Sequence, residues 1–131
     1  MLLLAKAAIK GDIRLPTPEE DVDHGIDLVS PDTLIQIKTK QDANGLKIYS
    51  DPQQLIQDTA QSVEQMDLTQ PHIASFASRL KDEANTYEHM AAYASSQGKK
   101  SAYILLPSGA IDFQSAEPTG KHDLSLLSQI T

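Results

Sequence analysis

Asp27, Gln36 and Lys38 are the residues whose types and spacing best fit the chemistry of phosphodiester cleavage. Asp27 lies in the run 25–29, the other two lie in the run 34–40, and both runs alternate like strands. Residues two apart in a strand point to one face, and a hairpin partner can bring Asp27 beside them. A carboxylate and a second oxygen ligand hold a divalent cation, and a nearby lysine stabilises charge on the phosphate. The pattern therefore predicts a metal-dependent site on this hairpin.

The neighbouring sequence predicts the strands that would support such a site. A Ser-Pro-Asp turn joins the two runs, and an Asn-Gly turn then leads into a third strand at 46–49. Residues 102–106 are apolar enough for a buried strand, which a Pro-Ser-Gly turn returns to a strand at 110–113. These runs predict a three-stranded meander and, later in the chain, a returning hairpin.

Two helices are predicted between these groups of strands. Asp51 is a good N-cap and Pro52 suits the first helical position, so one helix begins there. A longer helix begins near Pro71 and stops before Gly98. Its apolar stripe consists of Ile73, Phe76, Ala77, Leu80, Ala84, Tyr87, Ala91 and Ala94.

The remaining segments complete one domain. Short apolar stretches at 2–9 and 124–130 are predicted as terminal helices, and Pro16 and Pro18 bracket a loop that runs into the acidic stretch 19–23. The order helix, strands, helices, strands predicts a single α/β domain over residues 1–131, packed in layers.

Composition narrows the functional classes. The 131 residues include no cysteine, which excludes a disulfide framework, a thiolate zinc site and a cysteine nucleophile. Apolar runs such as residues 1–4 are far shorter than the roughly 20 residues that span a bilayer, so no membrane association is expected. The net charge of −7 argues against a protein that coats nucleic acid, but it suits a carboxylate cluster that binds cations.

A resemblance to a nuclease superfamily is carried by Asp23-His24-Gly25-Ile26-Asp27-Leu28-Val29 followed by Leu34-Ile35-Gln36-Ile37-Lys38. This pattern resembles the PD-(D/E)xK nucleases, and most closely the Mrr-like group, in which Gln replaces the acidic residue of the second motif. The resemblance implies a restriction-endonuclease-like central mixed sheet flanked by helices. The helix predicted at 52–66 stands where that family places the helix after its lysine strand.

The resemblance also implies roles for individual residues. Asp27 would be the metal carboxylate, Gln36 the second ligand through its side-chain oxygen, and Lys38 the catalytic lysine. The cofactor would be Mg²⁺ or Mn²⁺.

The third metal ligand is less directly indicated. The family often adds an acidic residue from its N-terminal helix, but residues 2–9 contain no acid. Glu20 is the substitute candidate, and Glu19 and Asp23 are accessory candidates behind it. His24 lies beside the site and would act as a base, contact phosphate, or simply form part of a turn.

Three functions remain open on the sequence. A nuclease of this kind would cut DNA, or RNA such as tRNA if the chain is a toxin domain of a contact-dependent growth inhibition system. It would act in the cytoplasm, and a toxin would need a cognate immunity protein. Alternatively, an acidic domain could itself be the inhibitor or immunity protein of a basic nuclease. The third interpretation is a structural domain in which Asp27 and Lys38 form a surface ion pair of little energetic value.

Overall fold

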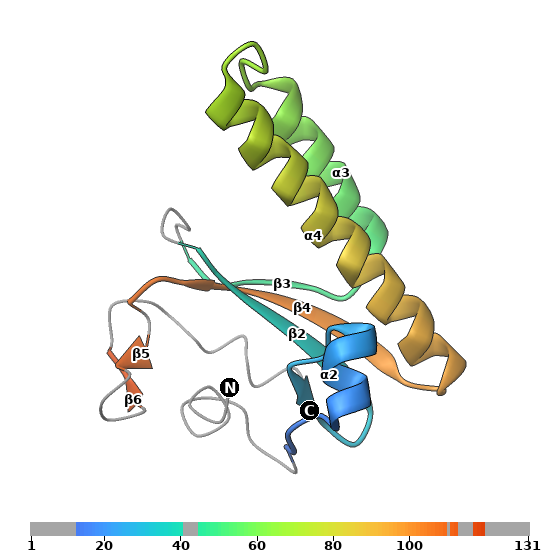
Figure 1. Ribbon diagram of the computed structural model, residues 1–131. Coiled ribbons are helices and arrows are strands. Elements are labelled where there is room, and N and C mark those ends of the chain that lie inside the picture. Colours follow the sequence, from blue (N-terminus) through green and yellow to red (C-terminus); the bar gives the residue numbers. More distant parts are fainter. Residues whose placement is uncertain (1–12, 41–44, 110, 113–116, 120–131) are drawn as a thin grey trace.

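The structure is a computed structural model that describes residues 13–40, 45–109, 111–112 and 117–119 (Figure 1). Its elements in chain order are α2 (Pro18–His24), β1 (Leu28–Val29), β2 (Thr33–Lys40), β3 (Lys47–Tyr49), α3 (Pro52–Glu64), α4 (Pro71–Ser96), β4 (Lys100–Pro107), β5 (Ile111–Asp112) and β6 (Glu117–Pro118). The helices predicted at 2–9 and 124–130 lie outside the described residues. An α/β architecture is confirmed.

The central sheet is mixed and has the strand order β1-β2-β4-β3. β1 pairs with β2 in antiparallel fashion, with Leu28 opposite Ile35, so the predicted hairpin is confirmed. β4 runs parallel to β2, and β3 pairs antiparallel with β4. A parallel neighbour needs a long crossover, and the two long helices supply it.

The predicted three-stranded meander is wrong, because β4 lies between β2 and β3. The middle of β4 is its most apolar part, and both Tyr103 and Ile104 are buried although they point to opposite faces. A strand with apolar side chains on both faces buries the most apolar surface at the centre of the sheet, where it is covered on both sides. The returning hairpin is also wrong: β4 already has a neighbour on each side, and β5 pairs with β6 in a separate two-stranded sheet.

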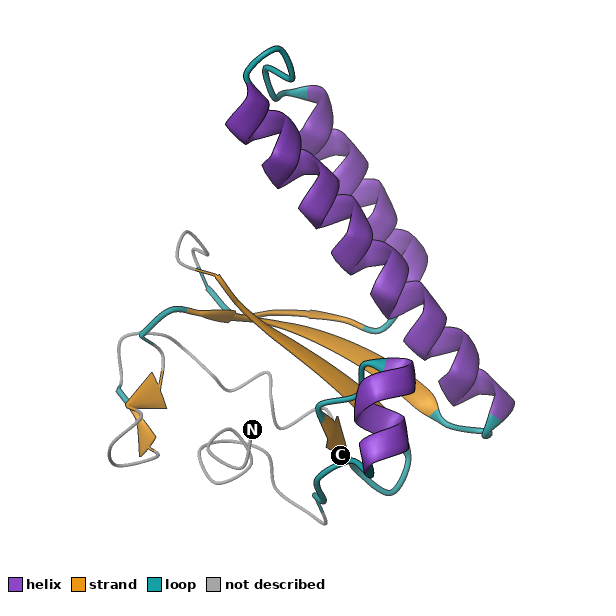
Figure 2. Cartoon of the chain, in the orientation of Figure 1, coloured by secondary structure: helices purple, strands orange, loops and turns teal. Residues whose placement is uncertain are grey.

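α3 and α4 form a helical hairpin whose lower end packs on the sheet and whose other end projects beyond it (Figure 2). The predicted starts are confirmed, since Asp51 caps α3 by accepting from the Gln53 backbone N–H at 3.0 Å. The core between hairpin and sheet consists of Ile26, Val29, Leu34, Tyr49, Leu55, Ala84, Tyr87, Met90, Ala94 and Tyr103. Phe76, predicted for the apolar stripe, is 41% exposed because it belongs to the projecting half of α4.

α2 was not predicted, although its sequence carries a readable start signal. The Thr17 hydroxyl accepts from the Glu20 N–H at 3.2 Å, and the Glu20 carboxylate accepts from the Thr17 N–H at 2.8 Å. This capping box, with Pro18 at the first helical position, outweighs the loop signal of the two prolines. The helix ends at Gly25, which adopts a left-handed φ of 67° and leads directly into β1.

Candidate active site

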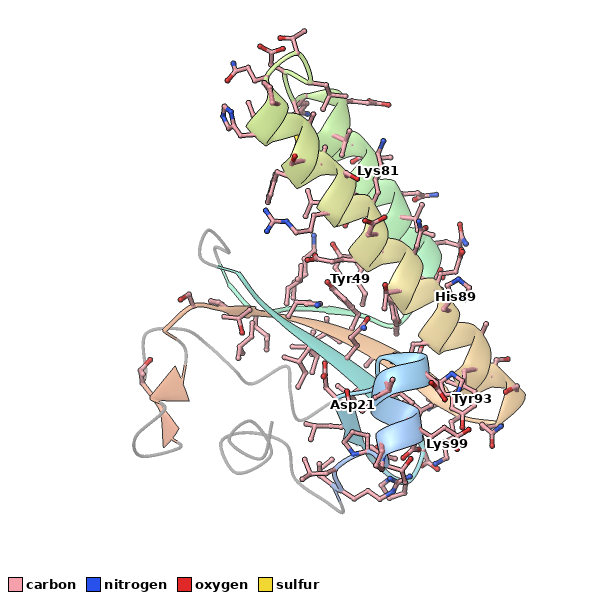
Figure 3. All side chains as sticks on the ribbon, viewed as in Figure 1. Asp21, Tyr49, Lys81, His89, Tyr93 and Lys99 are labelled. Atoms are coloured by element: carbon pink, nitrogen blue, oxygen red, sulfur yellow. The ribbon has the colours of Figure 1, made fainter. Side chains whose placement is uncertain are left out.

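The register of the sheet sets side chains in two rows on the face that α4 covers. Gln36 on β2 lies next to Tyr103 on β4, and Tyr103 lies next to Tyr49 on β3. Two residues further along β2, Lys38 begins a second row that continues with Leu105 and Lys47. Figure 3 shows Tyr49 in the angle between the helical hairpin and the sheet. Gln36 and Lys38 therefore share the face toward the helices, as their spacing predicts.

Asp27 joins this pair from the edge of the sheet. Its backbone N–H donates to the Ile35 carbonyl at 2.8 Å, and its carboxylate Oδ2 accepts from the Ile37 backbone N–H at 2.8 Å. The Ile37 amide lies between Gln36 and Lys38 in the chain. One carboxylate oxygen of Asp27 is thus held beside the segment that carries the two other predicted residues.

Burial raises the pKa of the Asp27 carboxyl above its ordinary value. The hydrogen bond from Ile37 and the positive charge of Lys38 oppose this shift, while the negative charge of Asp21 adds to it. Asp21 lies on α2, near β2 in the view of Figure 3. The ionised carboxylate therefore lacks full compensation from its surroundings, and a cation beside it would supply what is missing.

Gln36 contributes a buried oxygen that has no partner. The residue is only 4% exposed, and its Nε2 donates to the Gly25 carbonyl at 3.1 Å. Its Oε1 is buried and accepts no hydrogen bond in the part of the chain that the structure describes. An orphaned buried acceptor costs free energy unless a water or a cation binds it. This atom is the strongest single indication that the site receives a ligand.

Gly25 fits the turn beneath Gln36 for two separate reasons. Its φ of 67° is a conformation that residues with a side chain adopt only with strain. A methyl group on Gly25 would also lie 3.1 Å from Gln36 Nε2 and 3.3 Å from Thr86 Cγ2. The Gln36 amide and the α4 side chain Thr86 therefore both lie close beside Gly25.

We expect Gly25→Ala to lower the free energy of unfolding more than Gly98→Ala does. Gly98 has nearly the same φ, 68°, but nothing lies within 4 Å of the added methyl group. Both substitutions carry a conformational cost of about 1–2 kcal/mol. Gly25→Ala adds an overpacking cost of about 1–3 kcal/mol. Denaturant unfolding of the two variants isolates this contact, and equal losses would show that Gln36 and Thr86 do not crowd the position.

Tyr103 lies next to Gln36 in the sheet, and the sequence did not single it out as a site residue. Tyr103 is 1% exposed, its ring lies 5.2 Å from that of Tyr87, and within the described residues its hydroxyl makes no hydrogen bond. Burial raises the pKa of this phenol, and the charges of Glu83, Tyr49 and Asp27 raise it further. Both carboxylates, from α4 and from the edge of β1, are therefore close enough to Tyr103 to act on it electrostatically.

The acidic residues of α2 that the sequence suggested as further ligands have surroundings different from those of Asp27 and Gln36. Arg14 donates to both carboxylate oxygens of Glu20, at 2.8 and 3.0 Å, and these bonds, together with the one from the Thr17 amide, lower the pKa of Glu20 to about 2. Glu19 and Asp23 are exposed. None of these acids is bonded to Asp27 or Gln36 where the structure is described.

His24 also makes its main contact with a residue outside the predicted site. It is the last residue of α2, and its ring stacks on that of Tyr93 with centroids 3.6 Å apart and an angle of 10° between the planes. The stack attaches α2 to α4. This contact gives His24 a packing role, in place of the simple turn position that the sequence suggested.

The donor atoms present suit a hard divalent cation. Across the described ranges, no group of three or more His, Cys, Asp or Glu side chains has metal-binding geometry. The candidate set of the Asp27 carboxylate and the Gln36 amide oxygen falls below that count, but oxygen donors are the ligands that Mg²⁺ and Mn²⁺ prefer. The unpartnered Gln36 Oε1 is the observation that makes these residues fit the ion.

A separate cavity of about 610 Å³ lies at the other end of the strands. It is lined by residues such as Thr33, at the start of β2, and Lys100, at the start of β4, with Ser95 of α4 above them. Asp27, Gln36 and Lys38 do not line it. The cavity is therefore distinct from the candidate active site.

Comparisons of the chain with protein-family models, with curated proteins and with solved structures found no match. None of the helices described here is both long enough and apolar enough to cross a membrane.

Proposed function

We propose that the chain is a metal-dependent nuclease that hydrolyses phosphodiester bonds in nucleic acid. The observation that carries this proposal is the buried, unpartnered Oε1 of Gln36 on β2, the strand whose Ile37 N–H binds the half-buried Asp27 carboxylate. Lys38 follows Gln36 on the same face of β2. A carboxylate, a second oxygen ligand and a lysine can together serve metal-assisted phosphoryl hydrolysis.

The arrangement of the strands supports the same proposal. β1 and β2 form an antiparallel hairpin, and a helical crossover then leads to β4, which runs parallel to β2. A mixed sheet of this kind, flanked by helices, is what the restriction-endonuclease-like fold requires. The proposed fold therefore agrees with the residues that carry the sequence resemblance.

Each of the three proposed site residues would have its own role in the reaction. Asp27 would hold Mg²⁺ or Mn²⁺ through the oxygen that Ile37 does not occupy, and Gln36 would hold it through Oε1. The bound ion supplies Lewis-acid polarisation of the phosphoryl group and lowers the pKa of its water. Among the described residues Lys38 makes no hydrogen bond or ion pair, so its ammonium is available to the charge that develops on the phosphate.

An acidic inhibitor is the alternative function, and such a protein needs free carboxylates on one face. Several acids serve the fold instead, since Glu20 is bound by Arg14, Asp58 accepts from Tyr49 and Lys47, and Asp67 accepts from its own turn. The exposed acids Glu19, Asp21 and Asp23 on α2 are the carboxylates that would remain for such a docking face. For the nuclease, the proposed partners are the nucleic-acid substrate and, for a toxin domain, a cognate immunity protein.

The test is incubation of the purified chain with plasmid DNA, single-stranded DNA and total tRNA, in magnesium and in chelator. The proposal expects cleavage of at least one substrate in magnesium and none in chelator. Equal cleavage in chelator would overturn the metal requirement. The class of substrate that is cut would also distinguish a DNA-cutting enzyme from a tRNA-cutting toxin domain.

A further inference from the structure

We infer that the cavity of about 610 Å³ between α3, α4 and the starts of β2 and β4 binds a small molecule through a phosphate group. Its volume lies within the range of about 300–1,000 Å³ that is usual for small-molecule sites. Asp27, Gln36 and Lys38 do not line this cavity, so the inference goes beyond the proposed nuclease and does not rest on it.

Short side chains on one face of α4 leave the space that a ligand would fill. Ala91, Ala92 and Ser95 line the cavity from this helix, at spacings that place them on neighbouring positions of its surface. From the sheet, the cavity is lined by Thr33 and Lys100, which are paired at the starts of β2 and β4. The space therefore lies between the last turns of α4 and two strand ends.

The charge of the lining favours an anion. Lys99 and Lys100 both line the cavity, and within the described residues neither ammonium makes a hydrogen bond or an ion pair. The acid of the lining is Glu88, whose carboxylate already accepts from the Gln53 side-chain amide at 3.2 Å. The lining is thus net positive in a chain whose net charge is −7. An anion in the cavity would give both lysines the partner that the protein does not supply.

The backbone holds the two lysines in place beside the cavity. The Lys99 N–H donates to the Ala94 carbonyl at 2.9 Å, and the Lys100 N–H donates to the Asp32 carbonyl at 2.8 Å. Lys99 lies beside the end of α4 that packs on the sheet (Figure 3). Lys99 is half-buried and Lys100 is exposed. A ligand can therefore reach two cations that project from adjacent, fixed positions.

Hydroxyl groups in the lining favour phosphate over a simple carboxylate. Ser50 and Ser95 are exposed there, and in the part of the chain that the structure describes their hydroxyls make no hydrogen bond. A phosphate monoester carries a charge of about −1.5 to −2 and three acceptor oxygens. It can therefore accept from two ammonium groups and from nearby hydroxyls at once, which matches this lining in both charge and number of donors.

The test is binding of inorganic phosphate, adenosine monophosphate and succinate to the whole chain, followed by amide NMR shifts at constant ionic strength. Phosphate and adenosine monophosphate should shift the amides of Thr33, Ser95 and residues 99–101. Lys99→Gln should weaken binding by about tenfold or more, because it removes a charge-assisted hydrogen bond. Lys81→Gln is the matched control, since Lys81 is exposed on the same helix outside the cavity lining, and it should bind as the wild type does.

Two further variants separate a ligand inside the cavity from general attraction to lysines. Ala92→Leu keeps both lysines but fills space from an exposed position of α4, so it should weaken binding of adenosine monophosphate while unfolding stays cooperative. Glu88→Gln keeps an oxygen for Gln53 and removes the acid from the lining, so it should tighten binding. Weaker binding in Glu88→Gln would mean that a cationic group of the ligand is bound there, which would overturn the phosphate assignment.

Other outcomes would also contradict the inference. Succinate that binds as tightly as phosphate would show that the cavity selects negative charge alone. A wild type that binds neither phosphate nor adenosine monophosphate would show that the lysines only complement the C-terminal end of α4. None of these results bears on Asp27 or Lys38, so a failure here leaves the nuclease proposal standing, and a failure to cleave nucleic acid leaves this site standing.

Discussion

Replacing Asp27 by Asn should abolish magnesium-dependent cleavage while leaving the fold intact. Asn keeps an oxygen that accepts from the Ile37 N–H, which Asp27 Oδ2 binds at 2.8 Å, so the backbone contact survives. The substitution removes the negative charge that would bind the cation. Metal stabilisation of the transition state contributes several kcal/mol, so we expect a rate loss on the order of 1000-fold or more.

The same substitution should not destabilise the metal-free protein at neutral pH. Burial raises the pKa of Asp27, so the folded state binds its proton more tightly than the unfolded state does. The stability of the wild type therefore falls as pH rises above the ordinary Asp pKa of about 3.9, whereas Asn does not titrate. Relative to the wild type, Asp27→Asn should gain stability from acid to neutral pH, as denaturant unfolding in chelator would measure.

Asp32→Asn provides the control for both measurements. Asp32 is exposed in the turn between β1 and β2, and it contributes its backbone carbonyl to Lys100. Neutralising it removes one negative charge near the sheet without touching the proposed ligands. Cleavage by Asp27→Asn at the rate of the Asp32→Asn control would remove Asp27 from the metal site.

Lys38→Ala should lower turnover on the order of 100- to 1000-fold with little change in substrate binding. A positive group that acts only on charge developing in the transition state contributes about 2.7–4 kcal/mol. Lys38→Arg should restore little of this, because a planar guanidinium cannot occupy the position of a compact ammonium. Turnover and substrate affinity are measured separately, by single-turnover kinetics and by equilibrium binding in Ca²⁺.

Lys47→Ala is the matched control for Lys38. Lys47 lies in the same row of the sheet, two strands away, but its ammonium is already 3.3 Å from the Asp58 carboxylate. Losing this exposed ion pair should change stability by about 0–1 kcal/mol and leave turnover nearly unchanged. Undiminished turnover in Lys38→Ala, or an equal loss in Lys47→Ala, would refute the assignment of Lys38.

The parts of the structure that the sequence could predict are those governed by local rules. The alternation of 34–40 places Gln36 and Lys38 on one face, and the turn before it places β1 beside β2. The Asp51-Pro52 pair marks the start of α3 because capping depends on neighbouring residues alone. α2 belongs to the same class, since its capping box of Thr17 and Glu20 can be recognised in the sequence and outweighs the loop signal of the two prolines.

The parts that could not be predicted depend on contacts between distant segments. β3 has only three residues, and nothing within it indicates whether β2 or β4 is its neighbour. Tyr103 reaches the site only because β4 takes the centre of the sheet, beside β2. Glu20, the substitute for an acid that residues 2–9 lack, gives its carboxylate to Arg14, a contact that depends on folding.

The central claim is tested most directly by comparing the wild type with the Asp27→Asn/Lys38→Ala double variant, purified in parallel, on plasmid DNA and total tRNA in magnesium. We predict that the wild type cuts at least one substrate and that the double variant cuts none at matched concentration, while both unfold cooperatively. Cutting by both proteins at the same rate, or by neither, would contradict the claim that these residues form a metal-dependent nuclease site.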